Sequence, residues 1–330
     1  MLNGRYCCLG LLGLLLASLL LAVSIGSVAI PLTTVLDALW RPLLGQSSTE
    51  MTARIVLELR LPRVLMAMLC GAGLALCGWV LQSITRNPLA DPYLFGIASG
   101  ASLGAVLAMA FGVSAWGLSG SAFVGALTAA LLVLSLARHG RIETLILAGV
   151  AISFLLSSLA SLVLYFADPQ AIQAVLFWSL GSFARVQWSD LPTPALLLSV
   201  TVLIVMQQYR PLLALLSGDE SAQTQGIAVL PLRLGMLLLC ALLTASLVSL
   251  CGGIGFVGLM VPHLSRLLLA HSGVLIVPLT ALMGALLMVW VDLLARTMLP
   301  NQELPVGVLT AILGSLFFLG LLIRQQRRSI

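Results

Sequence analysis

The chain has 330 residues, of which 60% are hydrophobic and 8% are charged, and its formal net charge is +5. A soluble domain carries about 25% charged residues, so this composition excludes a soluble fold and requires the bilayer as solvent. The sequence contains neither an H-E-x-x-H motif nor a G-x-x-x-x-G-K-[ST] phosphate loop, which excludes a recognisable zinc-protease or ATP-binding site.

About ten apolar runs follow one another along the chain, each close to the roughly 20 residues that a helix needs to cross the hydrocarbon core. They cover 8–30, 61–84, 93–113, 119–137, 144–166, 191–208, 234–252, 254–270, 274–298 and 304–323. The eighth run is short and interrupted. The sequence therefore predicts an all-α polytopic membrane protein with about ten transmembrane helices, in which residues 1–330 form a single domain.

The first run is longer than the roughly 7–15-residue apolar core of a signal peptide, which favours a retained helix; a cleaved signal is the alternative. The second run begins with Arg60-Leu-Pro-Arg63 and is followed by Arg86-Asn-Pro-Leu-Ala-Asp-Pro92. Charge is costly in lipid, so these arginines are expected at or beyond the membrane faces. The two X-Pro pairs in the second motif then end the helix and reverse the chain.

All sixteen basic residues are arginines, and their distribution predicts the orientation of the chain. An even number of spans places both termini on one side. Ten arginines fall on that side, so the positive-inside rule predicts that the N- and C-termini are cytoplasmic. The arginines on the outer side are Arg41, Arg54, Arg60, Arg63, Arg185 and Arg296.

Three of the outer arginines, Arg60, Arg63 and Arg296, begin or end a span. Fixed positive charge on an outer face suits docking of an acidic partner, because complementary charge steers encounter and fixes register. Asp292 lies four residues before Arg296, which predicts a local ion pair on one helix face. The alternative to docking is that the outer arginines snorkel, or pair with Glu50, Glu58, Asp168 and Glu303.

Two polar segments interrupt the apolar runs. The segment 168–190 lies outside and is amphipathic, with Phe177 and Trp178 among its aromatic residues. It is either an interfacial helix in the aromatic belt or a short helix at the mouth of a pathway. The segment 209–233 is cytoplasmic, and its Asp219 and Glu220 can favour the N-terminus of a short helix. It is either a solvated loop or a contact for a cytosolic partner.

Other features have modest interpretations. The six cysteines show no ligand spacing, and His263 has no second ligand at helical spacing, so the sequence predicts neither a metal site nor a disulfide framework. Small residues recur within two runs and predict close helix packing in lipid. The glycines concerned are Gly71, Gly73, Gly78, Gly96, Gly100 and Gly104.

Together these motifs resemble those of the iron-chelate, haem and cobalamin permease family of bacterial ABC importers, which are type II importers. The resemblance covers nearly the whole chain and rests on residues 60–63, 86–92, 147–150, 218–226, 255–263 and 303–307. It implies ten helices per subunit, a second permease subunit in a homodimer, two cytosolic ATPase subunits and a periplasmic substrate-binding protein, all at the bacterial inner membrane. It implies no catalytic residue, no bound cofactor and no nucleic-acid partner, because the ATPase subunits use the ATP.

The resemblance also implies roles for particular residues. Those implied to dock the binding protein are Arg60, Arg63 and Arg296. The residues of the cytoplasmic loop that the resemblance implies contact the ATPase are Ser217, Gly218, Asp219, Glu220, Ala222 and Gly226. Those implied to line the pathway are Phe177, Trp178, Gly181 and Ser182 at the outer mouth, and Ile142, Glu143 and Thr144 at the cytoplasmic exit.

The expected cargo is an iron chelate, a ferric siderophore or haem, because such chelates are the commonest cargo of these systems; cobalamin is the alternative. An ATPase-independent channel predicts rings of polar or charged residues along the spans, which the sequence does not show. An intramembrane enzyme predicts paired ionisable residues deep in the spans, for which His263 and Asp292 are weak candidates. Neither alternative accounts for the outer arginines and the inner acidic loop together.

Overall fold

The computed structural model describes residues 4–26, 28–41, 51–112, 115–137, 142–268, 273–300 and 302–326. Helices account for most of these residues, and no strand occurs among them; Leu299 and Gln302 form one isolated bridge. The predicted all-α class is confirmed.

Eight helices within the described ranges are long and apolar enough to cross a membrane, so the protein is a multi-pass membrane protein. One of them is continuous from Met51 to Thr85 and joins α3 (Met51–Arg54), η2 (Ile55–Arg60) and α4 (Leu61–Thr85). The other long helices are α1 (Gly4–Ser24), α6 (Ala115–Leu136), α7 (Ile142–Tyr165), α9 (Pro192–Gln207), α12 (Val229–Cys251), α14 (Ile276–Thr297) and α15 (Val306–Gln326).

The third and eighth predicted runs form shorter apolar helices, α5 (Ile97–Ala110) and α13 (Val257–Leu268). Each begins late because the backbone before it turns left-handed, at Gly96 with φ +73° and at Phe256 with φ +67°. At 1.5 Å per residue, these helices are roughly 20 Å long, against about 30 Å for the hydrocarbon core. The expected ten spans are therefore eight long helices and two short ones.

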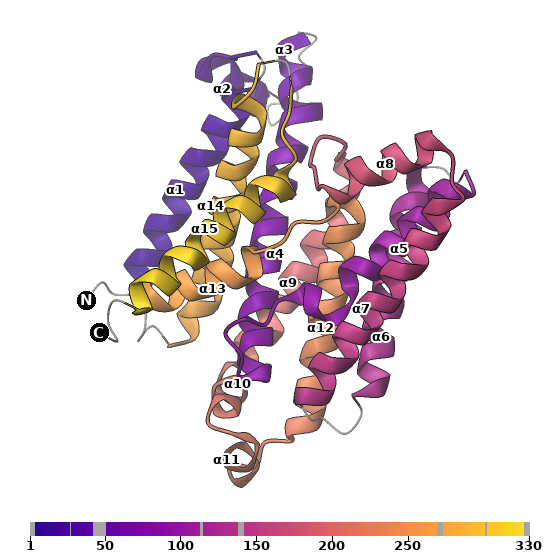
Figure 1. Ribbon diagram of the computed structural model, residues 1–330. Coiled ribbons are helices and arrows are strands. Elements are labelled where there is room, and N and C mark those ends of the chain that lie inside the picture. The colour runs from indigo at the N-terminus through magenta and orange to yellow at the C-terminus, as the bar shows by residue number, and fades with distance from the viewer. Residues whose placement is uncertain are drawn as a thin grey trace.

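Short helices lie at the two ends of the bundle (Figure 1). One end carries α2 (Leu32–Trp40) and α8 (Pro169–Ser179), and we call it the α8 end. The opposite end carries α10 (Tyr209–Leu216) and α11 (Asp219–Thr224), and we call it the α11 end. Helix α1 begins and α15 ends toward the α11 end. The remaining short turns are η3 (Pro92–Phe95), η4 (Trp188–Asp190) and η5 (Gly273–Leu275).

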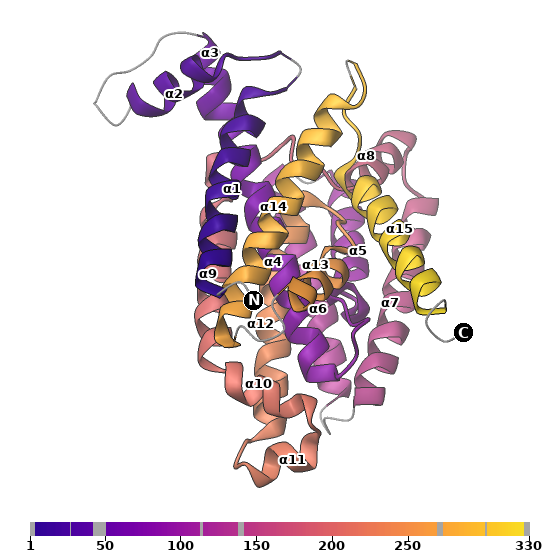
Figure 2. The same ribbon diagram turned by 90° about the vertical axis from the view of Figure 1, so that its left-hand side faces the viewer.

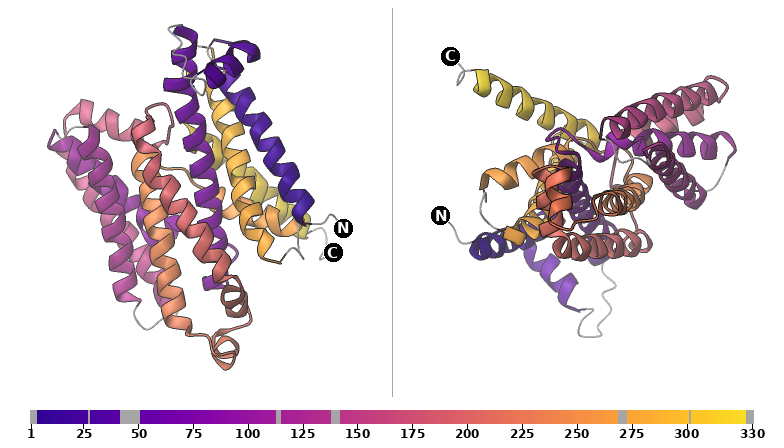
Figure 3. Two further views of the ribbon diagram at one scale, coloured as in Figure 1. Left: turned by 180° about the vertical axis from the view of Figure 1, so that it is seen from behind. Right: turned by 90° about the horizontal axis from the view of Figure 1, so that it is seen from below.

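Helix α4 runs through the middle of the bundle, with α9, α12, α13 and α14 packed around it (Figures 2 and 3). Glycines make this packing possible. A Cβ atom on Gly71 would lie 2.1 Å from the Gly284 carbonyl oxygen of α14, and one on Gly78 would lie 2.0 Å from the Gly258 carbonyl oxygen of α13. Because small residues let helix backbones approach closely in lipid, the packing role predicted for these α4 glycines is confirmed.

Helices α5 and α6 approach in the same way, through Gly100 and Gly104. A Cβ atom on Gly100 would lie 2.3 Å from the Gly125 carbonyl oxygen of α6. Residues 100–104 match the G-x-S-x-G pattern of hydrolase nucleophile elbows, but they lie inside a helix and not on a strand-to-helix turn. Gly96 departs from the expectation, because it precedes α5 in a left-handed turn and does not belong to the helix face.

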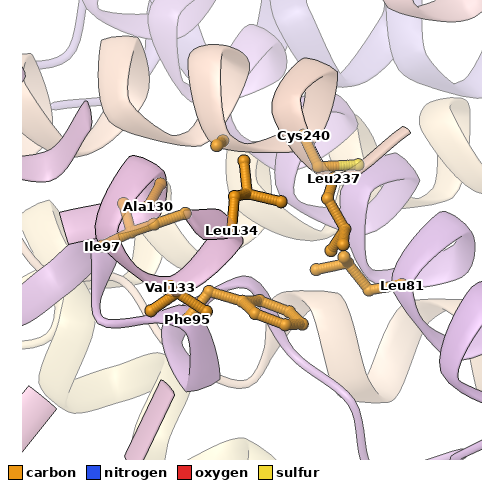
Figure 4. Close-up of a pocket in the computed structure, with 9 residues that line it drawn as sticks. Leu81, Phe95, Ile97, Ala130, Val133, Leu134, Leu237 and Cys240 are labelled. Atoms are coloured by element: carbon orange, nitrogen blue, oxygen red, sulfur yellow. The ribbon is translucent and has the colours of Figure 1, made fainter. Parts of the chain in front are cut away.

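A small apolar cavity lies where α4, α5, α6 and α12 meet (Figure 4). Its volume is about 10 Å³, which is room for no more than one water molecule. We interpret it as a gap in helix packing and not as a binding site. Its lining is Leu81, Phe95, Ile97, Ala130, Val133, Leu134, Leu237, Cys240 and Ala241.

Candidate functional site

At the α8 end, the three arginines singled out by the sequence line one pocket of about 330 Å³, which we call the arginine pocket. Arg60 comes from the last turn of η2, Arg63 from the first turn of α4 and Arg296 from the last turn of α14. Each is only 8% exposed, so these are enclosed charges and not loose surface side chains. Buried guanidinium groups need partners, and backbone carbonyl and carboxylate oxygens around the pocket supply them.

Two of these arginines hold the end of α1. Arg60 donates hydrogen bonds to the carbonyl oxygens of Val23 at 2.8 Å and Ser24 at 2.9 Å. Arg296 donates to the Ala22 carbonyl oxygen at 3.0 Å. The last carbonyls of a helix have no partner within it and carry partial negative charge, so cations at this position satisfy and stabilise them.

The third arginine, Arg63, joins two carboxylates. Its Nε lies 2.9 Å from Asp292 Oδ1, and its Nη1 lies 2.9 Å from both carboxylate oxygens of Glu303. Asp292 Oδ2 also lies 3.1 Å from Arg296 Nε, which confirms the predicted local ion pair. The hydrogen bond from Arg63 to Asp292 joins residues 229 positions apart, and no sequence pattern predicts it.

The outer carboxylates named in the sequence analysis have different partners. Glu58 pairs with Arg54 at 3.3 Å on an exposed helix face. Asp168 caps α8 by accepting the Ala171 backbone N–H at 2.9 Å. Glu303 pairs with Arg63, and Glu50 lies outside the described residues. Pairing with one of these four carboxylates therefore holds for Arg54 and Arg63, and Arg296 pairs with Asp292 instead.

A second pocket of about 300 Å³ lies beside the arginine pocket, and we call it the mouth pocket. It contains all four residues expected at the outer mouth: Phe177, Trp178, Gly181 and Ser182. Asp168 and Pro169 start α8, which carries the two aromatic residues to this position. Glu303 lines both pockets, a shared position that the sequence did not indicate.

The floor of the mouth pocket is a junction of three backbone segments. The Ser182 N–H donates to the Cys251 carbonyl oxygen at 2.9 Å, and the Val306 N–H donates to the Gly181 carbonyl oxygen at 3.0 Å. A Cβ atom on Gly252 would lie 2.0 Å from the Trp178 carbonyl oxygen. The segment after α8, the end of α12 and the start of α15 are therefore in direct backbone contact.

At the α11 end, Asp219 sits between two arginines. Its carboxylate lies 2.8 Å from Arg233 and 3.3 Å from Arg86. The hydrogen bond from Arg233 lowers the pKa of Asp219, with the charges of Arg233 and Arg86 adding to the effect and partial burial opposing it. Arg86 belongs to the motif after α4, so this contact joins two motifs that are far apart in the sequence.

The other residues of the expected coupling loop divide by exposure. Ala222 is fully buried, whereas Ser217, Glu220 and Gly226 are exposed. Gly218 and Gly226 have positive φ angles of +116° and +79°, which suit glycine and set the two turns that flank α11. Asp219 and Ala222 therefore hold α11 on the bundle, and Glu220 points away from these anchors into solvent.

The residues expected at the cytoplasmic exit start α7. Ile142 is partly buried, and Glu143 and Thr144 are exposed. Helix α7 ends next to α8, so its 24 residues place these three side chains at the other end of the bundle from the mouth pocket, roughly 36 Å away. The structure thus separates the two groups of expected pathway residues by the length of one helix.

Possible metal ligands do not cluster in the described part of the chain. Within the described ranges, no group of three or more His, Cys, Asp or Glu side chains is placed to hold a metal ion. His263 instead packs edge-on against the ring of Phe317, with 5.8 Å between the ring centres.

The structure is thus an all-helical membrane bundle with buried arginine–carboxylate pairs at one end and a short helix projecting at the other. The model of the FecCD transport family matches residues 14–324, so the chain belongs to the FecCD transport family. It is accordingly a permease of the ABC importer class.

Curated relatives match over most of their length. The hemin transport system permease protein of Yersinia pestis is 38% identical over 99% of both chains. The molybdate import system permease protein of Haemophilus influenzae is 37% identical over 97% of this chain and 95% of its own. The vitamin B12 import system permease protein of Vibrio cholerae is 39% identical over 87% of this chain and 88% of its own.

Among solved structures, a metal-chelate type ABC transporter in an inward-facing conformation superposes with a TM-score of 0.86. It is 34% identical to this chain and covers 97% of it, with 99% of that chain covered. A chain of the PsaBC complex from Streptococcus pneumoniae, at 16% identity and a TM-score of 0.56, shares the fold alone.

Proposed function

We propose that this permease carries an iron chelate, a ferric siderophore or haem, across the bacterial inner membrane, with cobalamin as the alternative cargo. The observation that carries the proposal is the match to the hemin permease along 99% of both chains. The likeness to a metal-chelate type transporter supports the same cargo class. Because vitamin B12 and molybdate permeases are about equally similar, the cargo has to be tested directly.

The proposed importer contains two copies of this chain, two cytosolic ATPase subunits and a periplasmic substrate-binding protein. Each copy forms one transmembrane domain over residues 1–330. The ATPase subunits use the ATP, and this chain contributes no catalytic residue, binds no cofactor of its own and contacts no nucleic acid. The α8 end faces the periplasm, and the α11 end with both termini faces the cytoplasm. Arginines toward the α11 end support this orientation: Arg5, Arg86, Arg210, Arg233 and Arg324.

Docking of the binding protein is proposed at the arginine pocket, on Arg60, Arg63 and Arg296. The enclosed guanidinium groups give the pocket fixed positive charge, which would guide acidic side chains of a partner. Reversing all three charges would also break the contacts that hold α1, so a milder change is the better test. We expect Arg60→Gln to weaken salt-sensitive docking, whereas Arg54→Gln, on an exposed helix face, leaves it unchanged. Because Arg60 also binds the end of α1, the Tm of Arg60→Gln is measured beside docking, and only a loss of docking without a matching loss of Tm counts for the proposal.

Coupling to the ATPase is proposed for the loop 209–233, through Ser217, Gly218, Asp219, Glu220, Ala222 and Gly226. The exposed position of Glu220 supports a direct contact with the ATPase. The two arginine contacts of Asp219 support an indirect role, in which this carboxylate holds α11 in place.

The cargo pathway is proposed to open at Phe177, Trp178, Gly181 and Ser182 and to narrow at Ile142, Glu143 and Thr144. The mouth pocket is lined by aromatic rings and backbone together with the charged residues Arg185 and Glu303. Its aromatic part suits a large cargo that must be released again, because apolar contacts retain a cargo less firmly than charge pairing does. The separation of the two groups along α7 supports their assignment to opposite membrane faces.

The experiment is uptake in a strain that lacks this permease, with labelled haem, ferric siderophore, cobalamin and molybdate offered in parallel. Loss of haem or siderophore uptake, restored by this chain, supports the proposal. Restoration of cobalamin or molybdate uptake alone overturns the iron-chelate assignment. Uptake that continues after deletion of every candidate ATPase subunit would instead favour a channel.

A further inference from the structure

Glu303 stands at the boundary between the arginine pocket and the mouth pocket. It lines the first with Arg63 and the second with Trp178 and Gly181. No role assigned above requires one residue to serve both pockets. A movement of Glu303 would therefore change the lining of both pockets.

The two carboxylates that bind Arg63 differ in their access to solvent. The side chain of Asp292 is 1% exposed, whereas that of Glu303 is 49% exposed. A carboxylate arriving from outside can therefore reach the Glu303 side of the Arg63 guanidinium but not the Asp292 side. Exchanging one carboxylate for another would keep Arg63 paired, which avoids the large penalty of an unpaired buried charge.

The charge of the arginine pocket also favours such an exchange. Three guanidinium groups, those of Arg60, Arg63 and Arg296, line this pocket. The carboxylates of Asp292 and Glu303 pair with Arg63 and Arg296, whereas Arg60 donates to backbone carbonyl oxygens, which leaves one positive charge in excess. If Glu303 swings away toward solvent, that excess grows to two. The pocket then attracts an acidic group more strongly, and the two events favour each other.

The backbone after Glu303 leads directly to the mouth. Leu304 donates its N–H to the Ala295 carbonyl oxygen of α14 at 2.9 Å. Two residues later, Val306 and Gly307 donate to the carbonyl oxygens of Gly181 at 3.0 Å and Leu180 at 3.1 Å. The 303–307 link, as we call these five residues, therefore connects the arginine pocket to the mouth pocket through consecutive contacts.

We propose that Glu303 is a positioning residue that couples docking to the mouth. In the undocked permease its carboxylate holds Arg63 and keeps the 303–307 link against Leu180 and Gly181. A carboxylate of the docked protein replaces it on Arg63, and the released link loosens its hold on the segment after α8. This inference rests on the docking site proposed above. It adds that Glu303 of this chain competes with a carboxylate of the docked protein for Arg63.

The first test is hydrogen exchange at single amides of the purified permease in lipid nanodiscs. Glu303→Gln removes the charge but keeps the shape, and should speed exchange of the Val306 and Gly307 amides about tenfold, the value expected for loss of a charged hydrogen bond. Glu303→Asp should restore part of the protection. Glu58→Gln is the matched control, since Glu58 is an exposed outer carboxylate paired with an arginine outside both pockets. Unchanged exchange in Glu303→Gln overturns the proposal.

The second test uses hexaglutamate as a carboxylate probe, with hexaglutamine as its neutral control. In the wild-type permease, hexaglutamate should speed exchange of the same two amides, and in Glu303→Gln it should bind without further effect. A purely structural role for Glu303 does not predict this dependence on the probe. Hexaglutamate that binds the wild type while Val306 and Gly307 stay protected overturns the coupling. If hexaglutamate fails to bind the wild type, the proposed docking site fails, and the first test alone decides the role of Glu303.

Discussion

The two ends of the bundle use the same chemistry, arginine paired with carboxylate, in different surroundings. At the α8 end, the side chains of Arg63, Asp292 and Arg296 are 10%, 1% and 5% exposed. At the α11 end, Asp219 and Arg86 are 35% and 39% exposed, and only Arg233 is enclosed. The first cluster joins helices within the bundle, and the second joins a short helix to the bundle from outside.

Similar charge motifs in a sequence can therefore have different structural consequences. Removing one partner of an enclosed ion pair leaves an uncompensated buried charge. Removing one partner of an exposed pair leaves a charge that water can solvate. The α8 cluster is therefore expected to govern the stability of the whole protein. The α11 cluster is expected to govern only the placement of α11 and, through it, the proposed coupling to the ATPase.

The largest effect is expected from Asp292→Ala. This change leaves Arg63 and Arg296 enclosed without their shared partner, and should lower the free energy of unfolding by about 3–5 kcal/mol. Thermal unfolding in detergent measures it as a lower Tm. A Tm within error of the wild type would show that the two ends do not differ in the way described.

A smaller and local effect is expected from Asp219→Ala. Loss of the contacts with Arg86 and Arg233 should loosen α11 by roughly 1 kcal/mol, since these contacts are partly screened by water. Limited proteolysis within 209–233 should accelerate while Tm stays nearly constant. Glu220→Ala is the matched control: α11 should remain protected, and only attachment of the ATPase should weaken. Equal loss of protection in both variants would contradict the division of roles.

The same anchor has a predictable pH dependence. The folded-state pKa of Asp219 lies below its unfolded value of about 3.9, so the anchor contributes stability above that value and loses it as pH falls through the folded pKa. Protection of α11 should stay constant from pH 7 to about pH 5 and fall below about pH 4. Asp219→Asn should abolish this component of the pH dependence. If the wild-type protein already lost protection of α11 between pH 7 and pH 5, the titration of Asp219 would not be the cause.

The smallest effect is expected from Arg54→Gln. The pair of Arg54 and Glu58 lies on an exposed helix face with side chains 64% and 59% exposed. Such i,i+4 pairs contribute about 0.3–0.5 kcal/mol, so the Tm should not change measurably. A clear drop in the Tm of the isolated permease would contradict the weak contribution expected of an exposed pair. A drop seen only in the assembled importer would mean that a partner covers this face.

Much of the fold was predictable because membrane solvent imposes simple rules. The apolar runs were long enough to mark the helices, and Arg296 lies in the last turn of α14 as charge predicts. Arg60 and Arg63 were expected to begin a span, but they lie within the continuous helix from Met51 to Thr85, which starts nine residues before Arg60. The eighth run, which forms α13, was recognisably short, but the length of α5 and the starting points of α5 and α13 were not predictable from hydropathy. The left-handed turns at Gly96 and Phe256 set those boundaries, and hydropathy does not report backbone dihedrals.

The class of this protein, most of its helices and the residue types at its candidate sites follow from local hydrophobicity, charge and motif, so they can be predicted from the sequence. Which charges meet depends on the packed fold. Asp292 was expected to bind Arg296 and also binds Arg63, and Glu303 borders both pockets. Asp219, an expected ATPase contact, proves to be bound by Arg86 and Arg233. Such pairings depend on how helices far apart in the sequence pack together, and no local pattern encodes that arrangement.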